Sequence, residues 1–66
     1  MARSSLSPSR IRSLRRRHRV SQPAFAAYLN VSSATVKAWE QGARRPTGAS
    51  LKLLSLVARK GLAALA

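Results

Sequence analysis

Helix start and stop signals recur at short intervals along this chain, and they limit what it can fold into. Each start is a hydroxyl side chain that can accept a hydrogen bond from a free N–H of the first helical turn. Two starts are followed by a proline in that turn, where its missing N–H needs no partner. Each stop is Asn or Gly, which tolerate the left-handed conformation in which helices often end. The starts are Ser7, Ser21, Ser32 and Thr47, and the stops are Asn30, Gly42 and Gly61.

Apolar residues between these signals follow helical spacing, and we find no strand pattern and no internal repeat. The fold class that we predict is all-α, with four or five short helices in one compact domain. The expected helices span residues 8–18, 22–29, 33–41 and 49–60. The domain would extend over residues 8–61, with a flexible arm at 1–7 and a short apolar tail at 62–66. In the tail, Leu62 and Leu65 are candidates for a dimer contact.

Composition excludes several classes of function. A chain of 66 residues buries only roughly 60% of its unfolded surface, so we expect no large enclosed active site. It has no cysteine, one histidine and one acidic residue, which leaves no metal site, no cofactor and no carboxylate pair for acid–base catalysis. We therefore expect a protein that is not an enzyme. A formal net charge of +12 indicates a polyanionic partner or an anionic surface.

The second and third expected helices are joined by about three residues, so they must cross steeply, as in a helix-turn-helix. One side of the third helix carries the large apolar residues Val36 and Trp39. Its other side is mostly small, which would allow the helix to lie deep in the DNA major groove, about 12 Å wide. The residues on that side, expected to face the bases, are Ser33, Ala34, Lys37 and Ala38.

The stretch SQPAFAAYLNVSSATVKAWEQGARRPTGASLKLLSLV resembles the phage repressor and Cro type (XRE type) of helix-turn-helix protein. Within that family it is most similar to the HigA-type antitoxins of toxin–antitoxin operons, where YLNVS, WEQG, RRP and LKLL recur. The resemblance covers roughly residues 10–62. It implies a lambda-repressor-like domain that regulates transcription, a repressor or the autorepressing antitoxin of such an operon, in the bacterial cytoplasm.

The resemblance also implies roles for individual residues. Gln22 would hold a phosphate at the N-terminus of its helix, whose dipole and free N–H groups favour anions. Base contacts would specify sequence, and phosphate contacts would set position. The full set of expected phosphate contacts is Arg10, Ser21, Gln22, Ser32, Thr35, Arg44 and Arg45. The implied partners are double-stranded DNA with an inverted-repeat operator, a second copy of the chain and a cognate toxin, and no membrane.

Glu40, the only acidic residue, borders the packed face of the third helix. In the family this Glu pairs with an Arg of the first helix, and the match in register puts Arg15 opposite it. A bidentate pair would tie the first helix to the third and be stronger than an exposed one. We therefore expect a structural ion pair and no contact between Glu40 and DNA, whose phosphates repel a carboxylate.

Two other interpretations share the high positive charge. A cationic membrane-active or targeting peptide built on the Arg-rich N-terminus would be unfolded in buffer and helical on anionic vesicles. The capped helices and the apolar positions needed to dock them argue against it. A small basic RNA-binding protein would not need small residues along the third helix.

Overall fold

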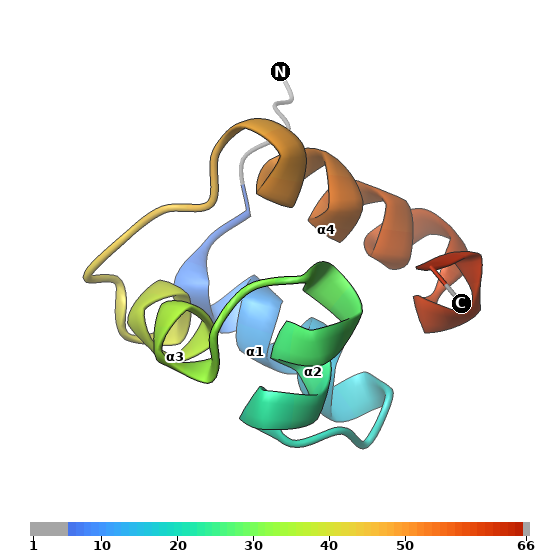
Figure 1. Ribbon diagram of the computed structural model, residues 1–66, viewed down its shortest axis with the longest axis horizontal. Coiled ribbons are helices and arrows are strands. Elements are labelled where there is room, and N and C mark those ends of the chain that lie inside the picture. Colours follow the sequence, from blue (N-terminus) through green and yellow to red (C-terminus); the bar gives the residue numbers. More distant parts are fainter. Residues whose placement is uncertain (1–5, 66) are drawn as a thin grey trace.

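The computed structural model describes residues 6–65 of the chain, and the side chains of residues 6–63. The α-helices are α1 (Pro8–Arg17), α2 (Gln22–Leu29), α3 (Ser33–Gln41) and α4 (Gly48–Lys60), and a 3-10 helix, η1 (Leu62–Leu65), follows them (Figure 1). The part of the chain that is described contains no strand, so the all-α class with four or five helices is confirmed. The expected arm, residues 1–7, lies mostly outside the described residues.

Hydroxyl caps hold the N-termini of three helices, as predicted. The Oγ atoms of Ser7, Ser21 and Ser32 accept from the backbone N–H three residues later, at 3.3, 3.2 and 3.1 Å. Thr47 occupies the same position before α4 but makes no such bond, so this predicted cap is wrong. The backbone enters α4 differently, because Thr47 has a φ of −138° and Gly48 a left-handed φ of +56°.

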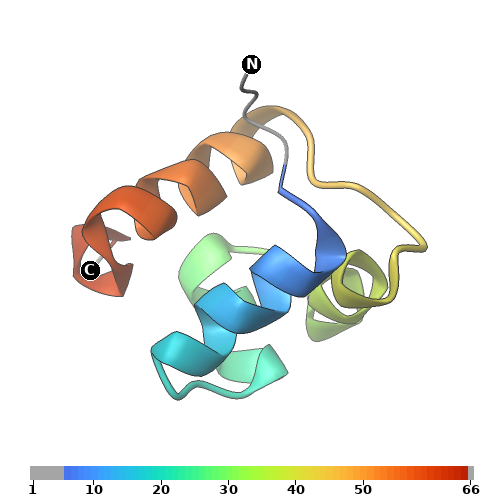
Figure 2. The same cartoon turned by 180° about the vertical axis from the view of Figure 1, so that it is seen from behind.

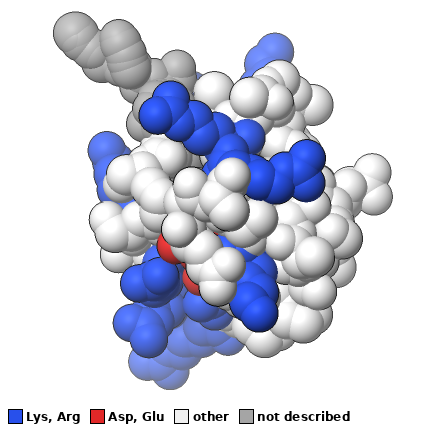
Figure 3. Space-filling view, turned by 90° about the vertical axis from the view of Figure 1, so that its left-hand side faces the viewer, with Lys and Arg blue, Asp and Glu red and all other residues white. Residues whose placement is uncertain are grey.

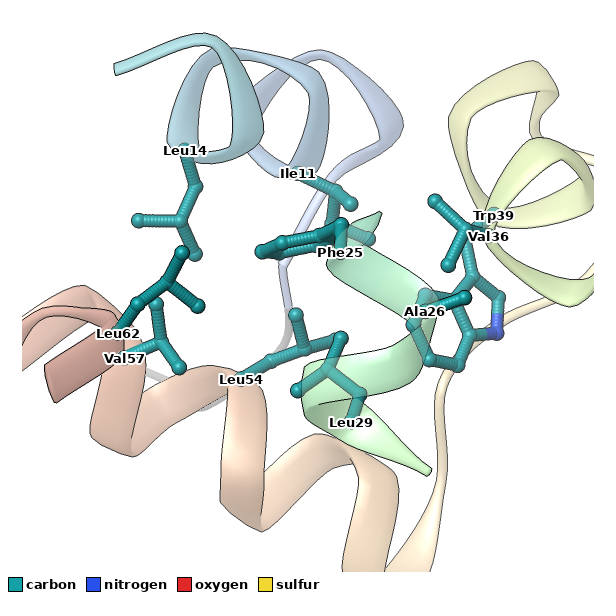
Figure 4. Packing of buried hydrophobic residues seen from close by; sticks show 10 residues of the cluster. All are labelled: Ile11, Leu14, Phe25, Ala26, Leu29, Val36, Trp39, Leu54, Val57 and Leu62. Carbon is teal, nitrogen blue, oxygen red and sulfur yellow. The ribbon is translucent and has the colours of Figure 1, made fainter. Parts of the chain in front are cut away.

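The hydrophobic core lies where α4 packs against α1 and α2, and α3 contributes to it from one side (Figure 4). Seen from behind, α4 runs above α1 (Figure 2). Phe25 of α2 and Leu54 of α4 are fully buried within the core. The buried apolar residues are Ile11, Leu14, Phe25, Ala26, Leu29, Val36, Trp39, Leu54, Val57 and Leu62.

Leu62 belongs to this core, which corrects the expectation that it offers a dimer contact. Gly61 ends α4 with a φ of +87°, and η1 then packs against α4 and α2. Leu62 is 8% exposed as a result and cannot reach a second molecule without leaving the core. The side chain of Leu65, the other candidate, lies outside the described residues.

Candidate nucleic-acid interface

The turn between α2 and α3 is built from local signals. Asn30 ends α2 with a left-handed φ of 59°, and the Val31 N–H donates to the Ala26 carbonyl at 3.0 Å. Ser32 then caps α3, so three residues separate the two helices. Because the turn is so short, α2 and α3 pack directly against each other and Val36 and Trp39 point into the core (Figure 4).

The opposite side of α3 is open. Ser33, Ala34 and Lys37 are exposed, and Ala38 is half-buried. Gln41 is also exposed, and at 3.6 residues per turn it lies between Lys37 and Ala34 on the same face. The sequence interpretation missed Gln41, although the helical period alone could have found it. These five residues are called the α3 outer face below.

Three hydroxyls expected to hold phosphates stand at helix starts. The Oγ atoms of Ser21 and Ser32 accept from backbone N–H groups, so each hydroxyl can still donate its own hydrogen. Thr35 is half-buried, and its Oγ1 lies 2.9 Å from the Ser32 Oγ. The hydroxyls of Ser32 and Thr35 thus form a pair in the first turn of α3, beside the α3 outer face.

The expected phosphate contacts do not form one cluster. Gln22 begins α2 and is half-buried, and its Nε2 donates to Glu40 Oε1 at 3.2 Å, a contact that the sequence interpretation missed. Arg44 and Arg45 are exposed in the loop after α3. Arg10 is exposed near the start of α1 and lines the same cleft as that loop, and no residue of α2 lines this cleft. Two separate cationic or donor regions therefore flank α3.

Glu40 and Arg15 form a bidentate ion pair between α3 and α1. Arg15 Nε donates to Glu40 Oε2 at 2.6 Å and Arg15 Nη2 donates to Oε1 at 3.0 Å. Arg15 Nη1 also donates to the Val20 carbonyl at 3.0 Å. Arg12, which the sequence interpretation did not connect to Glu40, donates through Nη2 to the Glu40 backbone carbonyl at 3.2 Å. Glu40 is 4% exposed, so every carboxylate oxygen is used inside the protein.

This environment keeps Glu40 ionised. Burial raises the pKa of Glu40, but hydrogen bonds from Arg15 and Gln22 and the charges of Arg15 and Arg12 outweigh it, so the pKa lies below its ordinary value. The hydrogen bond to Glu40 in turn raises the pKa of Arg15 above its ordinary value. Both members of the pair therefore stay charged at neutral pH. Arg15 neutralises the charge of Glu40, the one acidic side chain that would repel a phosphate.

Positive charge gathers on the side of the molecule that carries α3 and the loop after it (Figure 3). In this view Lys and Arg lie above and below a group of uncharged residues, and the single acidic residue shows only as small areas between them. Cationic groups therefore lie on two sides of the uncharged residues of this face. Among the described residues, no group of His, Cys, Asp or Glu is placed to hold a metal ion.

The amino-acid sequence was also compared with known protein families and proteins. Residues 11–65 match the protein-family model described as helix-turn-helix. Over 55 residues, the chain is 42% identical to a protein named antitoxin HigA-2 from Vibrio cholerae serotype O1. That alignment covers 83% of this chain and 53% of the relative, so the chain spans about half the length of the curated relative that it matches. None of the helices in residues 6–65 is long and apolar enough to cross a membrane.

Proposed function

The chain belongs to the helix-turn-helix family of the phage repressor and Cro type, and from this premise we propose that it is a sequence-specific DNA-binding regulator of transcription. It acts as a repressor, with α3 in the major groove of double-stranded DNA. Ser33, Ala34 and Lys37 contact base edges, together with Ala38 and Gln41. Ala at two of these positions can meet thymine methyl groups, and Lys37 can donate to guanine.

The observation that carries this proposal is the α3 outer face. Its side chains are short except for Lys37 and Gln41, and Trp39 and Glu40, which are large or charged, point inward. A helix with this face can approach the floor of the groove, and its N-terminal residues reach base edges as in other helix-turn-helix proteins. The hydroxyls of Ser21, Ser32 and Thr35 and the amide of Gln22 support phosphate contacts on one side of the groove.

Arg44 and Arg45 support phosphate contacts on the other side of the groove, together with Arg10, which lines the same cleft. A single domain of this size covers one half-site, so a homodimer on an inverted repeat is the form that we propose. The two half-sites would be about 34–36 Å apart or a multiple of that distance.

The salt dependence of binding to duplex DNA tests this function. If a dimer neutralises on the order of eight phosphates, log K should fall with log salt concentration with a slope of about −7. Arg44→Gln should make the slope less steep by about 2 per dimer, because each lost phosphate contact contributes about 0.9. Arg59→Gln, on the last turn of α4, is the matched control and should leave the slope unchanged. A wild-type slope near zero would exclude DNA binding through these cations.

An antitoxin is the second candidate function, and the name of the relative favours it. In this role the chain would repress its own operon and neutralise a toxin encoded beside it. Co-expression with the neighbouring open reading frame tests this directly. A short neighbouring gene that arrests growth alone, and not together with this chain, would support the antitoxin. Growth arrest that the chain does not relieve would exclude toxin neutralisation and leave DNA binding intact.

A further inference from the structure

A cleft of about 710 Å³ borders the end of α3. The start of α1, the end of α3, the loop after α3 and the start of α4 form its walls. Its volume falls within the range of about 300–1,000 Å³ that is typical of small-molecule sites. Trp39 lines it from the side of α3 that is opposite to the outer face, so the cleft is separate from the proposed base contacts.

The floor of the cleft is apolar. Ile11 and Trp39 lie beneath it, and they are 0% and 3% exposed. Pro46 is buried in the loop wall, and Leu6 and Leu51 are half-buried at the edges. The apolar body of a ligand seated here would be covered mainly by Leu6 and Leu51, which favours binding in proportion to the area covered.

The lining is cationic at three positions. Arg10, Arg44 and Arg45 all line the cleft and are all exposed. No acidic side chain balances them there, because Glu40 is the only one in the chain and is bonded to Arg15. Three guanidinium groups around an apolar floor are complementary to a planar anion such as a carboxylate, which Arg binds in a bidentate manner.

We propose that this cleft binds a small amphipathic carboxylate, a fatty or aromatic acid, and that the ligand withdraws Arg44 and Arg45 from DNA. The apolar floor takes the body of the acid, and the arginines take its carboxylate. Residues 1–5 include an arginine and no acid, so their charge does not complement the cleft.

The effect on DNA rests on the proposed function, because Arg44 and Arg45 are its phosphate contacts. An arginine side chain that turns into the cleft to hold a carboxylate is moved away from the phosphate that it would otherwise contact. The acid and the operator therefore weaken each other's binding by the same factor, as linkage requires. The acid acts as an inducer, and Ser33, Lys37 and the rest of the α3 outer face remain unchanged.

Nuclear magnetic resonance with octanoate, and with 1-octanol as the uncharged analogue, tests binding without DNA. The indole N–H of Trp39, the only tryptophan, gives one side-chain signal in the cleft, and the amide of Gly42 gives a second. We expect both signals to shift saturably with octanoate, and 1-octanol to bind at least about tenfold more weakly. Leu51→Gln and Arg45→Gln should each weaken octanoate binding several-fold, and Lys52→Gln should not. Equal binding of the alcohol, or shifts centred on Arg16 and Arg17 at the end of α1, which do not line this cleft, would overturn the proposal.

Competition with duplex DNA tests the withdrawal of the arginines. Saturating octanoate should lower the DNA affinity of the wild type several-fold. Leu51→Gln should keep its DNA affinity and lose this sensitivity, because Leu51 lines the cleft and is not a proposed DNA contact. An unchanged DNA affinity of the wild type in octanoate would refute the coupling. Saturable octanoate binding in a protein that does not bind DNA would instead refute the proposed function and leave the cleft site standing.

Discussion

Replacing Glu40 with glutamine keeps the shape of the side chain and removes the only negative side-chain charge in the protein. The carboxylate accepts from Arg15 at 2.6 and 3.0 Å and from Gln22 at 3.2 Å. The glutamine amide offers one acceptor oxygen, and its NH₂ group faces guanidinium donors that it cannot satisfy. We expect a folded but less stable protein whose DNA site preference is unchanged, since Glu40 is 4% exposed.

The loss of stability can be estimated from exposure. Removing one member of a fully buried ion pair costs about 3–5 kcal/mol, because a charge is left without its partner. The Arg15 side chain is 16% exposed and the Arg12 side chain 47%, so water compensates part of this. We therefore expect the free energy of unfolding to fall by about 2 kcal/mol. For a domain of this size the melting temperature should drop by about 8–16 °C.

The same pair predicts how stability depends on pH. The pKa of Glu40 is below its ordinary value of 4.5, so the unfolded chain binds the proton more tightly than the folded one. The contribution is fully present above this ordinary value, and it disappears as pH falls through the lower folded pKa. Glu40→Gln should lack this decline, so the wild type and the variant should approach each other in stability at acidic pH.

Circular dichroism melts at pH 7 and at steps below pH 4.5 measure both effects. The variant also carries one more net positive charge, and repeating the melts in 1 M salt screens that general repulsion. The double variant Arg15→Gln, Glu40→Gln is the matched control, because it leaves no unpaired arginine at position 15. It should be more stable than the sum of the two single variants predicts. A Glu40→Gln protein that melts like the wild type at pH 7 would refute the argument.

Three further substitutions separate folding from binding. Arg44→Ala should weaken binding to all DNA sequences about equally in gel-shift or fluorescence titrations. Arg59→Ala is the control and should leave binding unchanged. A changed site preference in Arg44→Ala would contradict the assignment of Arg44 to a phosphate contact. Ser32→Ala removes an N-cap and should lower the free energy of unfolding in urea titrations by about 1 kcal/mol; an unchanged midpoint would show that the cap contributes nothing. Leu62→Ala should lower the free energy of unfolding by about 2–4 kcal/mol at every protein concentration, because Leu62 lies in the core. A stability loss relative to the wild type that is seen only at low concentration would restore a dimer role for Leu62.

Local features of the fold could be predicted from the sequence because each depends on a few adjacent residues. The serine caps and the left-handed Asn30 and Gly42 follow from side-chain hydrogen bonding and backbone sterics within one turn. Thr47 shows the limit of this reasoning. A hydroxyl at the N-cap position makes the bond only if the backbone enters the helix in the usual way, and the left-handed Gly48 changes that entry.

Contacts between distant residues could not be predicted in the same way. Family resemblance supplies Arg15 as the partner of Glu40, which spacing alone does not, since 25 residues separate them. Neither spacing nor resemblance indicated that Arg12 and Gln22 also bond to Glu40, because this depends on how α1 and α2 pack against α3. The burial of Leu62 could not be predicted for the same reason, since the turn at Gly61 decides whether this side chain points into the core.

Selection from a randomised duplex library tests the central claim that the α3 outer face specifies the DNA sequence. The wild type and Lys37→Ala should be selected in parallel, with Lys52→Ala as the matched control on α4. We predict that the wild type enriches an inverted repeat, that Lys37→Ala changes the preferred base at one position of each half-site, and that Lys52→Ala enriches the wild-type sequence. If Lys37→Ala enriched the same sequence as the wild type with equal strength, the claim that this residue of α3 contacts bases would be contradicted.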